Sequence, residues 1–261
     1  MPLQLISSPL SELCKGDSWL VADVNYLAQC IAYVSLGHAR HVKKILEESG
    51  LSFSTALPFA TDEAINLLTV IGPDPSHRDG WIFQVISWVA ACKASGTCIV
   101  RMPQMRLADK GFDGILIRID EPSGELSAVV ICEDKATIKP RDIVRDKVWP
   151  EFRSMESGAK ENVLMAELVA LLDTVPTADA DDAIKNLIWA DIRHYRVSVT
   201  VEEDFIDNGR AAMFRGYEQV APGAVHRREA NVFPVADLRG WMQSVADLAI
   251  KYIKAADQKH V

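Results

Sequence analysis

The sequence predicts a mixed α/β domain in which a central sheet is flanked by helices, with further helices at both ends. Residues 128–132 are apolar at every position, which indicates a central strand buried on both faces. Residues 195–201 alternate and are rich in β-branched side chains, which indicates a further strand. Apolar residues at helical spacing occur before, between and after these strands.

The composition is that of a folded protein. The chain has 261 residues and a mass of 28.8 kDa, which fits one large domain or two small ones. Hydrophobic residues make up 49% of it, which excludes global disorder. The net charge of −8 argues against a protein that coats nucleic acid by charge alone, but it allows an enzyme with a local basic channel.

The chain shows no sign of export or membrane insertion. A charged start followed by an apolar core is absent from the N-terminal sequence, and no apolar run reaches about 18 residues. The five cysteines are odd in number and form no CxxC pair, which favours buried free thiols in a reducing compartment. We therefore expect a cytoplasmic protein.

Residues 1–75 are predicted to be a mainly helical N-terminal region. A helical stripe runs through residues 22–48, with Gly37 as an interruption and Gly50 as a helix stop. Residues 71–80 are rich in turn-forming residues and are the best candidate for a boundary.

Residues 76–205 are predicted to contain the sheet. We expect a helix over 81–95, closed by Gly96, and strands over 98–102, 111–120 and 126–135, the last two paired as a hairpin. A charged helix after Pro140 and a helix over 161–172 follow. An acidic loop over 176–183 then leads into a helix ending near His194, before the strand over 195–201.

Residues 206–261 are predicted to contain an irregular, Gly-rich segment over 206–234 and a long C-terminal helix. Apolar residues from Leu238 to Ile253 lie on one face of that helix. We expect the three regions to form one compact unit.

An acidic residue and an acidic-basic pair mark the two strands of the hairpin. Asp113 opens the first apolar run, and Glu133 and Lys135 follow the second. Residues i and i+2 of a strand share a face, so Glu133 and Lys135 would project together beside Asp113, and Asp134 would face the opposite side. Two carboxylates and a lysine can hold Mg²⁺ against a phosphate, which favours phosphodiester hydrolysis. We expect Asp113 and Glu133 as metal ligands, the carbonyl of Asp134 as a possible third, and Lys135 to orient water or steady the phosphate charge.

This pattern of Asp113 followed by Glu133-Asp134-Lys135 resembles the PD-(D/E)xK nuclease superfamily over residues 80–202. The resemblance implies a helix, three strands, a helix and a fourth strand, with the Asp on the second strand and the (D/E)xK on the third. It also implies that Gln84 assists catalysis, because many members place a Glu or Gln on the first helix near the metal. Phe112 stands where the family name has proline, a common departure.

The CEDKAT form of the motif, the small size and the C-terminal helix also resemble the nuclease subunit of Hachiman-type antiphage defence systems, which pairs with a separate helicase. This resemblance implies a DNA-cleaving effector that uses Mg²⁺, or Mn²⁺ in its place, under the control of a helicase or other regulatory subunit. The alternative is a non-catalytic interaction subunit that keeps a nuclease-like fold.

A local excess of basic residues follows the motif. Residues 135–160 contain seven Lys and Arg against four Asp and Glu. Lys139, Arg141 and Arg145 could contact a DNA backbone near the site. A solvated helix face with i,i+4 ion pairs explains them equally well, and Glu133 and Lys135 could themselves be a surface ion pair.

Other candidate sites are weaker. His38 and His41 have metal-ligand spacing, but no second ligand pair accompanies them, so zinc is not expected. Residues 16–18, with Asp257 and His260, superficially resemble a GDSL-type hydrolase. No apolar strand precedes them, however, and Asp17 or Ser18 is expected to be a helix cap or turn residue.

Two further features carry little functional signal. Residues 226–228, His-Arg-Arg, are expected to be a solvated loop that could touch nucleic acid or a partner. No Walker A or Rossmann glycine pattern occurs, so we expect no ATPase activity from this chain alone.

Overall fold

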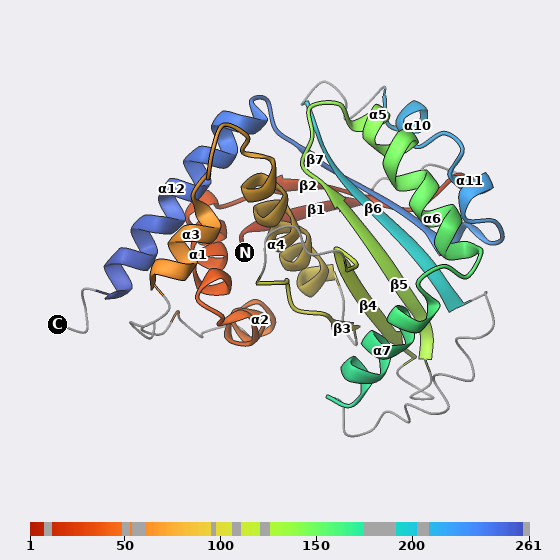
Figure 1. The fold of residues 1–261 in the computed structure, drawn as a ribbon, viewed down its shortest axis with the longest axis horizontal. Coiled ribbons are helices and arrows are strands. Elements are labelled where there is room, and N and C mark those ends of the chain that lie inside the picture. The colour runs from red at the N-terminus through yellow and green to blue at the C-terminus, as the bar shows by residue number, and fades with distance from the viewer. Residues whose placement is uncertain are drawn as a thin grey trace.

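The computed structural model describes residues 1–7, 12–48, 53, 61–94, 98–105, 111–120, 126–174, 192–202 and 209–257 (Figure 1). Its strands are β1 (Leu3–Ser7), β2 (Asp17–Val21), β3 (Cys98–Val100), β4 (Gly114–Ile119), β5 (Leu126–Lys135), β6 (Arg193–Val201) and β7 (Arg228–Pro234). In the described chain they form one seven-stranded sheet of order β1-β2-β7-β6-β5-β4-β3. The four strands from β2 to β5 in this order run parallel, whereas β1, β4 and β3 each run antiparallel to their inner neighbour.

Helices cover both faces of the sheet (Figure 1), which confirms the predicted mixed α/β fold. One face carries α1 (Val24–Ser35), α2 (Ala39–Glu47), α3 (Thr61–Leu68), α4 (Ser76–Ala94) and α12 (Leu238–Asp257). The other carries α5 (Pro140–Ile143), the π-helix η2 (Val144–Val148), α6 (Trp149–Glu156), α7 (Glu161–Leu172), α10 (Arg210–Met213) and α11 (Tyr217–Val220). Of the described helices, none is long and apolar enough to cross a membrane.

The central strand β5 separates two hydrophobic cores of the described chain. Its even-numbered residues 128–132 pack into the core under α4, and its odd-numbered residues 129 and 131 pack into the core under α6. This two-residue alternation continues to the end of the strand. The side chain of Asp134 therefore points toward α4. The side chains of Glu133 and Lys135 leave the strand on the face that α6 covers.

The predicted N-terminal helices are confirmed as α1 and α2, with Gly37 at φ 82° between them. Residues 1–75 also supply β1 and β2, which the prediction of a mainly helical region missed. Asp17 and Ser18 lie in β2, so the prediction of a helix cap or turn at these residues is wrong. The backbone N–H of Asp17 instead donates to Asn231 Oδ1 on β7 at 2.9 Å, and this contact ties β2 to the sheet.

The predicted boundary over residues 71–80 is helical in its second half, because α4 begins at Ser76. The carboxylate of Asp74 accepts hydrogen bonds from the backbone N–H and the hydroxyl of Ser76, at 2.9 and 2.8 Å. An Asp that accepts from the first backbone N–H groups of a helix favours helix initiation. This contact places the start of α4 earlier than the apolar run at Trp81 suggested.

Several predicted elements are confirmed near their predicted bounds: the 81–95 helix in α4, the strands β3, β4, β5 and β6, and the helices α7 and α12. The charged helix after Pro140 is present as the consecutive segments α5, η2 and α6. Gly50, Gly96, the turn of the β4–β5 hairpin, the acidic loop over 176–183 and the helix before His194 fall outside the described residues. His194 itself lies in β6.

The prediction of an irregular segment over 206–234 is wrong for residues 228–234, which form β7, and for the short helices α10 and α11. The expected solvated loop at 226–228 is also wrong for its two arginines, which are buried. Arg227 donates to the carbonyl of Arg193 at 2.9 Å, and Arg228 donates to the carbonyl of Leu13 at 2.7 Å. Backbone carbonyls thus accept hydrogen bonds from these two buried arginines, which the sequence analysis expected to be solvated.

Candidate active site

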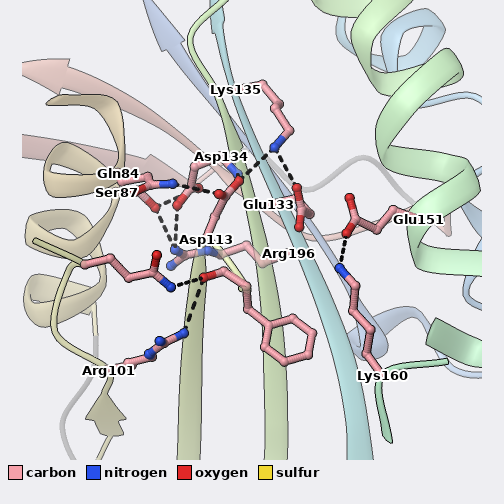
Figure 2. Close-up of polar contacts among 12 residues, drawn as sticks. Gln84, Ser87, Arg101, Asp113, Glu133, Asp134, Lys135, Glu151, Lys160 and Arg196 are labelled. Atoms are coloured by element: carbon pink, nitrogen blue, oxygen red, sulfur yellow. Dashed lines mark hydrogen bonds and ion pairs between the residues drawn. The ribbon is translucent and has the colours of Figure 1, made fainter. Parts of the chain in front are cut away.

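The three residues of the predicted motif meet at the open end of the β4–β5 hairpin (Figure 2). Gly114 pairs with Cys132 in the antiparallel register, so Asp113 and Glu133 come next on the two strands. The ammonium of Lys135 lies 2.8 Å from Asp113 Oδ2 and 2.7 Å from Glu133 Oε2. The two carboxylates therefore share the ammonium group of Lys135.

The carboxylate of Asp113 is held by two further donors. Gln84, on α4, donates its side-chain amide to Asp113 Oδ1 at 2.6 Å. The backbone N–H of Asp134 donates to Asp113 Oδ2 at 2.9 Å. A helix, a strand and the Lys135 side chain thus fix the orientation of this carboxylate, and the first of these contacts is at the residue predicted to assist.

Asp134 points away from the cluster, as the strand alternation predicted. Its carboxylate accepts from Ser87 Oγ at 2.8 Å and lies 3.9 Å from the guanidinium of Arg196 on β6. Burial raises the pKa of the Asp134 carboxyl, and the charge of Arg196 opposes this effect. The side chain of Asp134 thus contacts residues on the α4 side of the sheet, and only the main chain of Asp134 contacts the cluster.

Burial dominates the electrostatics of Glu133, which is 3% exposed. Burial and, secondarily, the charge of Asp113 raise the pKa of Glu133 to about 8, while Lys135 opposes them. Burial disfavours the charge of Lys135, but Glu133 and Asp113 outweigh it and raise the pKa of Lys135 above its ordinary value. The site therefore keeps Lys135 charged. A further positive charge nearby would lower the pKa of Glu133 and stabilise its ionised form.

The donor set fits a hard divalent cation that keeps several of its waters. Asp113 and Glu133 offer two carboxylates, and Mg²⁺ is commonly bound by one or two carboxylates together with water and phosphate oxygens. In the described parts of the chain no group of three or more His, Cys, Asp and Glu side chains could hold a metal ion. A metal ion here would accordingly be coordinated by these two carboxylates, a main-chain oxygen and water. Lys135 would contact the same two carboxylates.

A cavity of about 370 Å³ opens beside the cluster. Asp113, Gln84 and Lys135 line it, together with His77 near the start of α4 and Arg239 on α12. Arg239 is ion-paired with the fully buried Asp79 on α4. The cavity thus gives a ligand access to Asp113 and Lys135, and two further basic side chains, His77 and Arg239, line it.

A second charged pair, which the sequence analysis did not predict, lies on the far side of Glu133 (Figure 2). Glu151 on α6 accepts from Lys160 at 2.6 Å, and Lys160 also lies 5.7 Å from the ring centre of Phe112. The charge of Glu151 contributes to the raised pKa of Glu133. Ser87 was also missed, although its position three residues after Gln84 on one helix face could have indicated it.

The three predicted DNA-contacting residues differ in their surroundings. Lys139 is exposed just before α5. Arg141 donates to the carbonyls of Met213 and Arg215, at 2.6 and 3.2 Å. Arg145 is exposed but ion-paired with Asp146 and Asp142. The three residues therefore differ: Arg141 and Arg145 have protein partners, and Lys139 is exposed.

The competing candidate sites do not assemble within the described residues. His38 precedes α2, and its ring packs against Tyr33 with ring centres 6.0 Å apart. Asp17 and Ser18 lie in β2, while α12 ends at Asp257 and His260 falls outside the described residues. Among the described residues, no group of three or more potential metal ligands includes His38 and His41. The hydrolase-like set stays untested, because His260 is one of its members.

The site thus unites residues from α4, from the position directly before β4 and from the end of β5. Comparison with protein-family models, curated proteins and solved structures finds no match for the chain. Its function must be inferred from the chemistry of these side chains and the element order that presents them.

Proposed function

We propose that the chain is a metal-dependent nuclease of the PD-(D/E)xK type that cleaves DNA phosphodiester bonds. The observation that carries the proposal is the shared position of Lys135 between the carboxylates of Asp113 and Glu133. Side chains from three separate segments converge there beside an open cavity. A surface ion pair would need neither the third residue nor the cavity.

The order of elements also supports the proposal. The helix α4 is followed by the strands β3, β4 and β5, then by the helices α5 to α7 and the strand β6. This is the order that the PD-(D/E)xK resemblance implies. Asp113 lies directly before the second of these strands, and Glu133 and Lys135 lie at the end of the third.

Each residue has a role that follows from its position. Asp113 and Glu133 would hold Mg²⁺ or Mn²⁺, which when bound polarises a phosphate and lowers the pKa of a coordinated water. Lys135 places a positive charge where it can orient the attacking water or stabilise charge on the phosphate. Gln84 keeps Asp113 oriented. Glu133 must lose its proton to bind a cation, so metal affinity should rise with pH.

An unrestrained nuclease would damage its own cell, so the proposal includes control by a partner. The resemblance to Hachiman-type nuclease subunits favours a helicase as that partner and antiphage defence as the process. The exposed Lys139 beside the site is available for the DNA backbone.

A plasmid-nicking assay tests the activity. Supercoiled plasmid is incubated with wild type, Glu133→Ala, Lys135→Ala and the control Glu63→Ala, which changes an exposed residue of α3. Cutting that needs Mg²⁺ or Mn²⁺, survives in the control and disappears in both site variants would support the proposal. Cutting that is equal in all four proteins would contradict the site.

The alternative function, a non-catalytic interaction subunit, gives a different result. Such a protein would cut nothing, either alone or with a co-purified helicase and ATP. It would also show no rise in melting temperature with Mg²⁺ or Mn²⁺, whereas a metal site stabilises the folded state.

A further inference from the structure

A basic surface lies where the short helix α10 meets α5 (Figure 1). Residues 139–147 contain four Lys and Arg against two Asp, and Arg215, which follows α10, adds a fifth positive charge. Arg141 on α5 joins the two segments, because it donates to the carbonyls of Met213 and Arg215 at 2.6 and 3.2 Å. The whole chain has a net charge of −8, so this local excess of positive charge is a specific feature of the surface.

The backbone that presents Arg215 is held by side chains of the neighbouring helices. Trp149 on α6 donates its indole N–H to the carbonyl of Arg215 at 3.3 Å, and Arg141 donates to the same oxygen. Gly216 then has a φ of 89°, a conformation that favours glycine, and the chain turns there into α11. The side chain of Arg215 is exposed. It therefore extends into solvent from a backbone of fixed position.

The charges of Arg141 and Arg215 are not neutralised. Among the described residues, neither guanidinium is paired with a carboxylate, and Glu218, three positions after Arg215, forms no ion pair with it. Arg141 uses Nη1 for both of its carbonyl contacts, so its Nε and Nη2 have no partner within the described chain. Arg145, by contrast, is ion-paired with two aspartates. Two guanidinium groups on this surface are thus available to a ligand.

The positive charges on this surface disfavour one another. Burial, followed by the charges of Arg145 and Arg215, lowers the pKa of Arg141, and the opposing charges of Asp146 and Asp142 do not outweigh them. Like charges that are held close together destabilise each other's charged forms. An anion that contacts both Arg141 and Arg215 would remove this cost.

The basic surface lies beside the cavity of the candidate active site. Thr137 and Ile143 line that cavity, and Arg141 lies between them in sequence. Residues two apart on a helix point to opposite sides, so Arg141 leaves α5 on the side away from the cavity, toward α10. A helix is roughly 10 Å wide and a DNA strand advances about 3.4 Å per nucleotide, so about three nucleotides reach from the cavity to Arg141.

We propose that Arg141 and Arg215 bind the phosphate backbone of a DNA strand where it leaves the candidate active site. Guanidinium groups match phosphate oxygens in charge and in geometry. Contacts to phosphates position a strand without reading its sequence. The identity of the ligand as DNA rests on the proposed nuclease function. Arg215 lies outside residues 80–202, so the surface adds a substrate contact from beyond the nuclease-like core.

Binding is measured by fluorescence anisotropy in EDTA, where metal-dependent cleavage cannot occur. Wild type and Arg215→Glu are titrated into a labelled DNA duplex and into one of its separated strands. The charge reversal should weaken binding roughly tenfold and reduce the slope of log affinity against log salt by at least about one phosphate contact. Arg215→Lys keeps the charge and should stay within about threefold of wild type. No binding of either DNA by wild type would overturn the inference.

Arg40→Glu is the matched control. Arg40 is an exposed residue of α2, on the other face of the sheet, and this substitution changes the net charge by the same amount. Its affinity should stay within about twofold of wild type at physiological salt, because separated surface charges are largely screened. An equal loss in Arg40→Glu and Arg215→Glu would show an effect of net charge alone and contradict the surface.

The variant Arg141→Gln tests the second guanidinium. It should reduce the salt slope by about one contact, a change that a purely structural role would not produce. An unchanged slope in Arg141→Gln would remove Arg141 from the surface. A labelled polyglutamate peptide is the competing probe: tighter binding of the peptide than of DNA, lost in Arg215→Glu, would assign the surface to an acidic protein and overturn the DNA assignment.

Cleavage assays separate this inference from the nuclease proposal. In a cleaving preparation, Arg215→Glu should raise KM roughly tenfold and leave kcat within about twofold, because the contact is made equally before and during the reaction. Unchanged KM and kcat in Arg215→Glu would contradict the surface and leave the nuclease standing. DNA binding through Arg215 by a protein that never cleaves would contradict the nuclease and leave the surface standing.

Discussion

Gln84 on α4 donates its side-chain amide to the carboxylate of Asp113 at 2.6 Å, across 29 positions of sequence. This contact joins the helix layer to the sheet at the candidate active site. Because Asp113 also accepts from Lys135 and from the backbone of Asp134, its orientation is set before any ligand arrives. A preorganised carboxylate of this kind suits metal and phosphate chemistry.

Loss of the Gln84 amide should therefore slow cleavage without unfolding the protein. Gln84→Ala is expected to lower the single-turnover rate about tenfold, the equivalent of one hydrogen bond of roughly 1.4 kcal/mol. The control Gln219→Ala changes an exposed glutamine on α11. Equal rates for the two variants would show that the contact does not position Asp113.

The raised pKa of Glu133 predicts a pH-dependent stability in metal-free buffer. Burial sets this pKa at about 8, above that of an unfolded chain, so the proton binds the folded state more tightly. The stabilisation is complete at low pH and is lost as pH rises through 8. Glu133→Gln cannot ionise, so its melting temperature should fall about 5 °C less than that of wild type between pH 6 and pH 9. Thermal denaturation in EDTA measures this, and parallel curves would contradict the burial effect.

The side chain of Asp134 is expected to contribute to stability and not to catalysis. Asp134→Asn keeps a side-chain acceptor for Ser87 but removes the charge beside the buried Arg196. We expect a loss of about 2 kcal/mol in the free energy of unfolding, measured by urea denaturation. Cleavage should stay within about threefold of wild type, because the cluster uses only the main chain of this residue. A loss as large as that of Glu133→Ala would show that the carboxylate itself takes part.

The basic residues after the motif should contribute unequally to DNA binding. Lys139→Ala should weaken binding to all sequences alike and reduce the slope of log affinity against log salt by about one phosphate contact. Arg145→Ala should have a smaller effect, because Asp142 and Asp146 already neutralise that arginine. Fluorescence anisotropy across a salt series distinguishes the two. A larger effect at Arg145 would mean that its ion pairs break on binding.

The sequence predicted the elements that carry a clear local period. The helix α12 falls in this class, because its apolar residues recur at helical spacing. The β4–β5 hairpin was predicted from another local signal, two apolar runs separated by turn-forming residues. The strand β7 could not be predicted in this way, because it opens with Arg228 and Glu229 and contains Asn231. These polar residues are tolerated inside the sheet because each has a partner: carbonyls of Leu13 and Ala221 accept from Arg228, and Arg118 pairs with Glu229. The backbone N–H of Asp17 donates to Asn231. Such partners are a property of the fold and leave no local pattern.

The candidate site divides in the same way. The proximity of Asp113, Glu133 and Lys135 could be predicted from the sequence, because strand alternation and hairpin pairing depend on local sequence. Arg196 and Glu151 could not, because parallel pairing of β5 with β6 and the packing of α6 depend on the whole chain. Lys139, Arg141 and Arg145 looked equivalent by charge, but only the structure shows that Arg141 serves two backbone carbonyls.

In the proposed nuclease, Lys135, Asp113 and Glu133 act as one catalytic unit. The most direct test is the Mg²⁺-dependent cleavage rate of a labelled DNA substrate by wild type and Lys135→Ala, with circular dichroism confirming that both are folded. A rate at least a hundredfold lower in Lys135→Ala, on the order expected for a lost charge-stabilising group, is predicted. Cleavage at the wild-type rate by a folded Lys135→Ala protein would show that Lys135 has no part in catalysis.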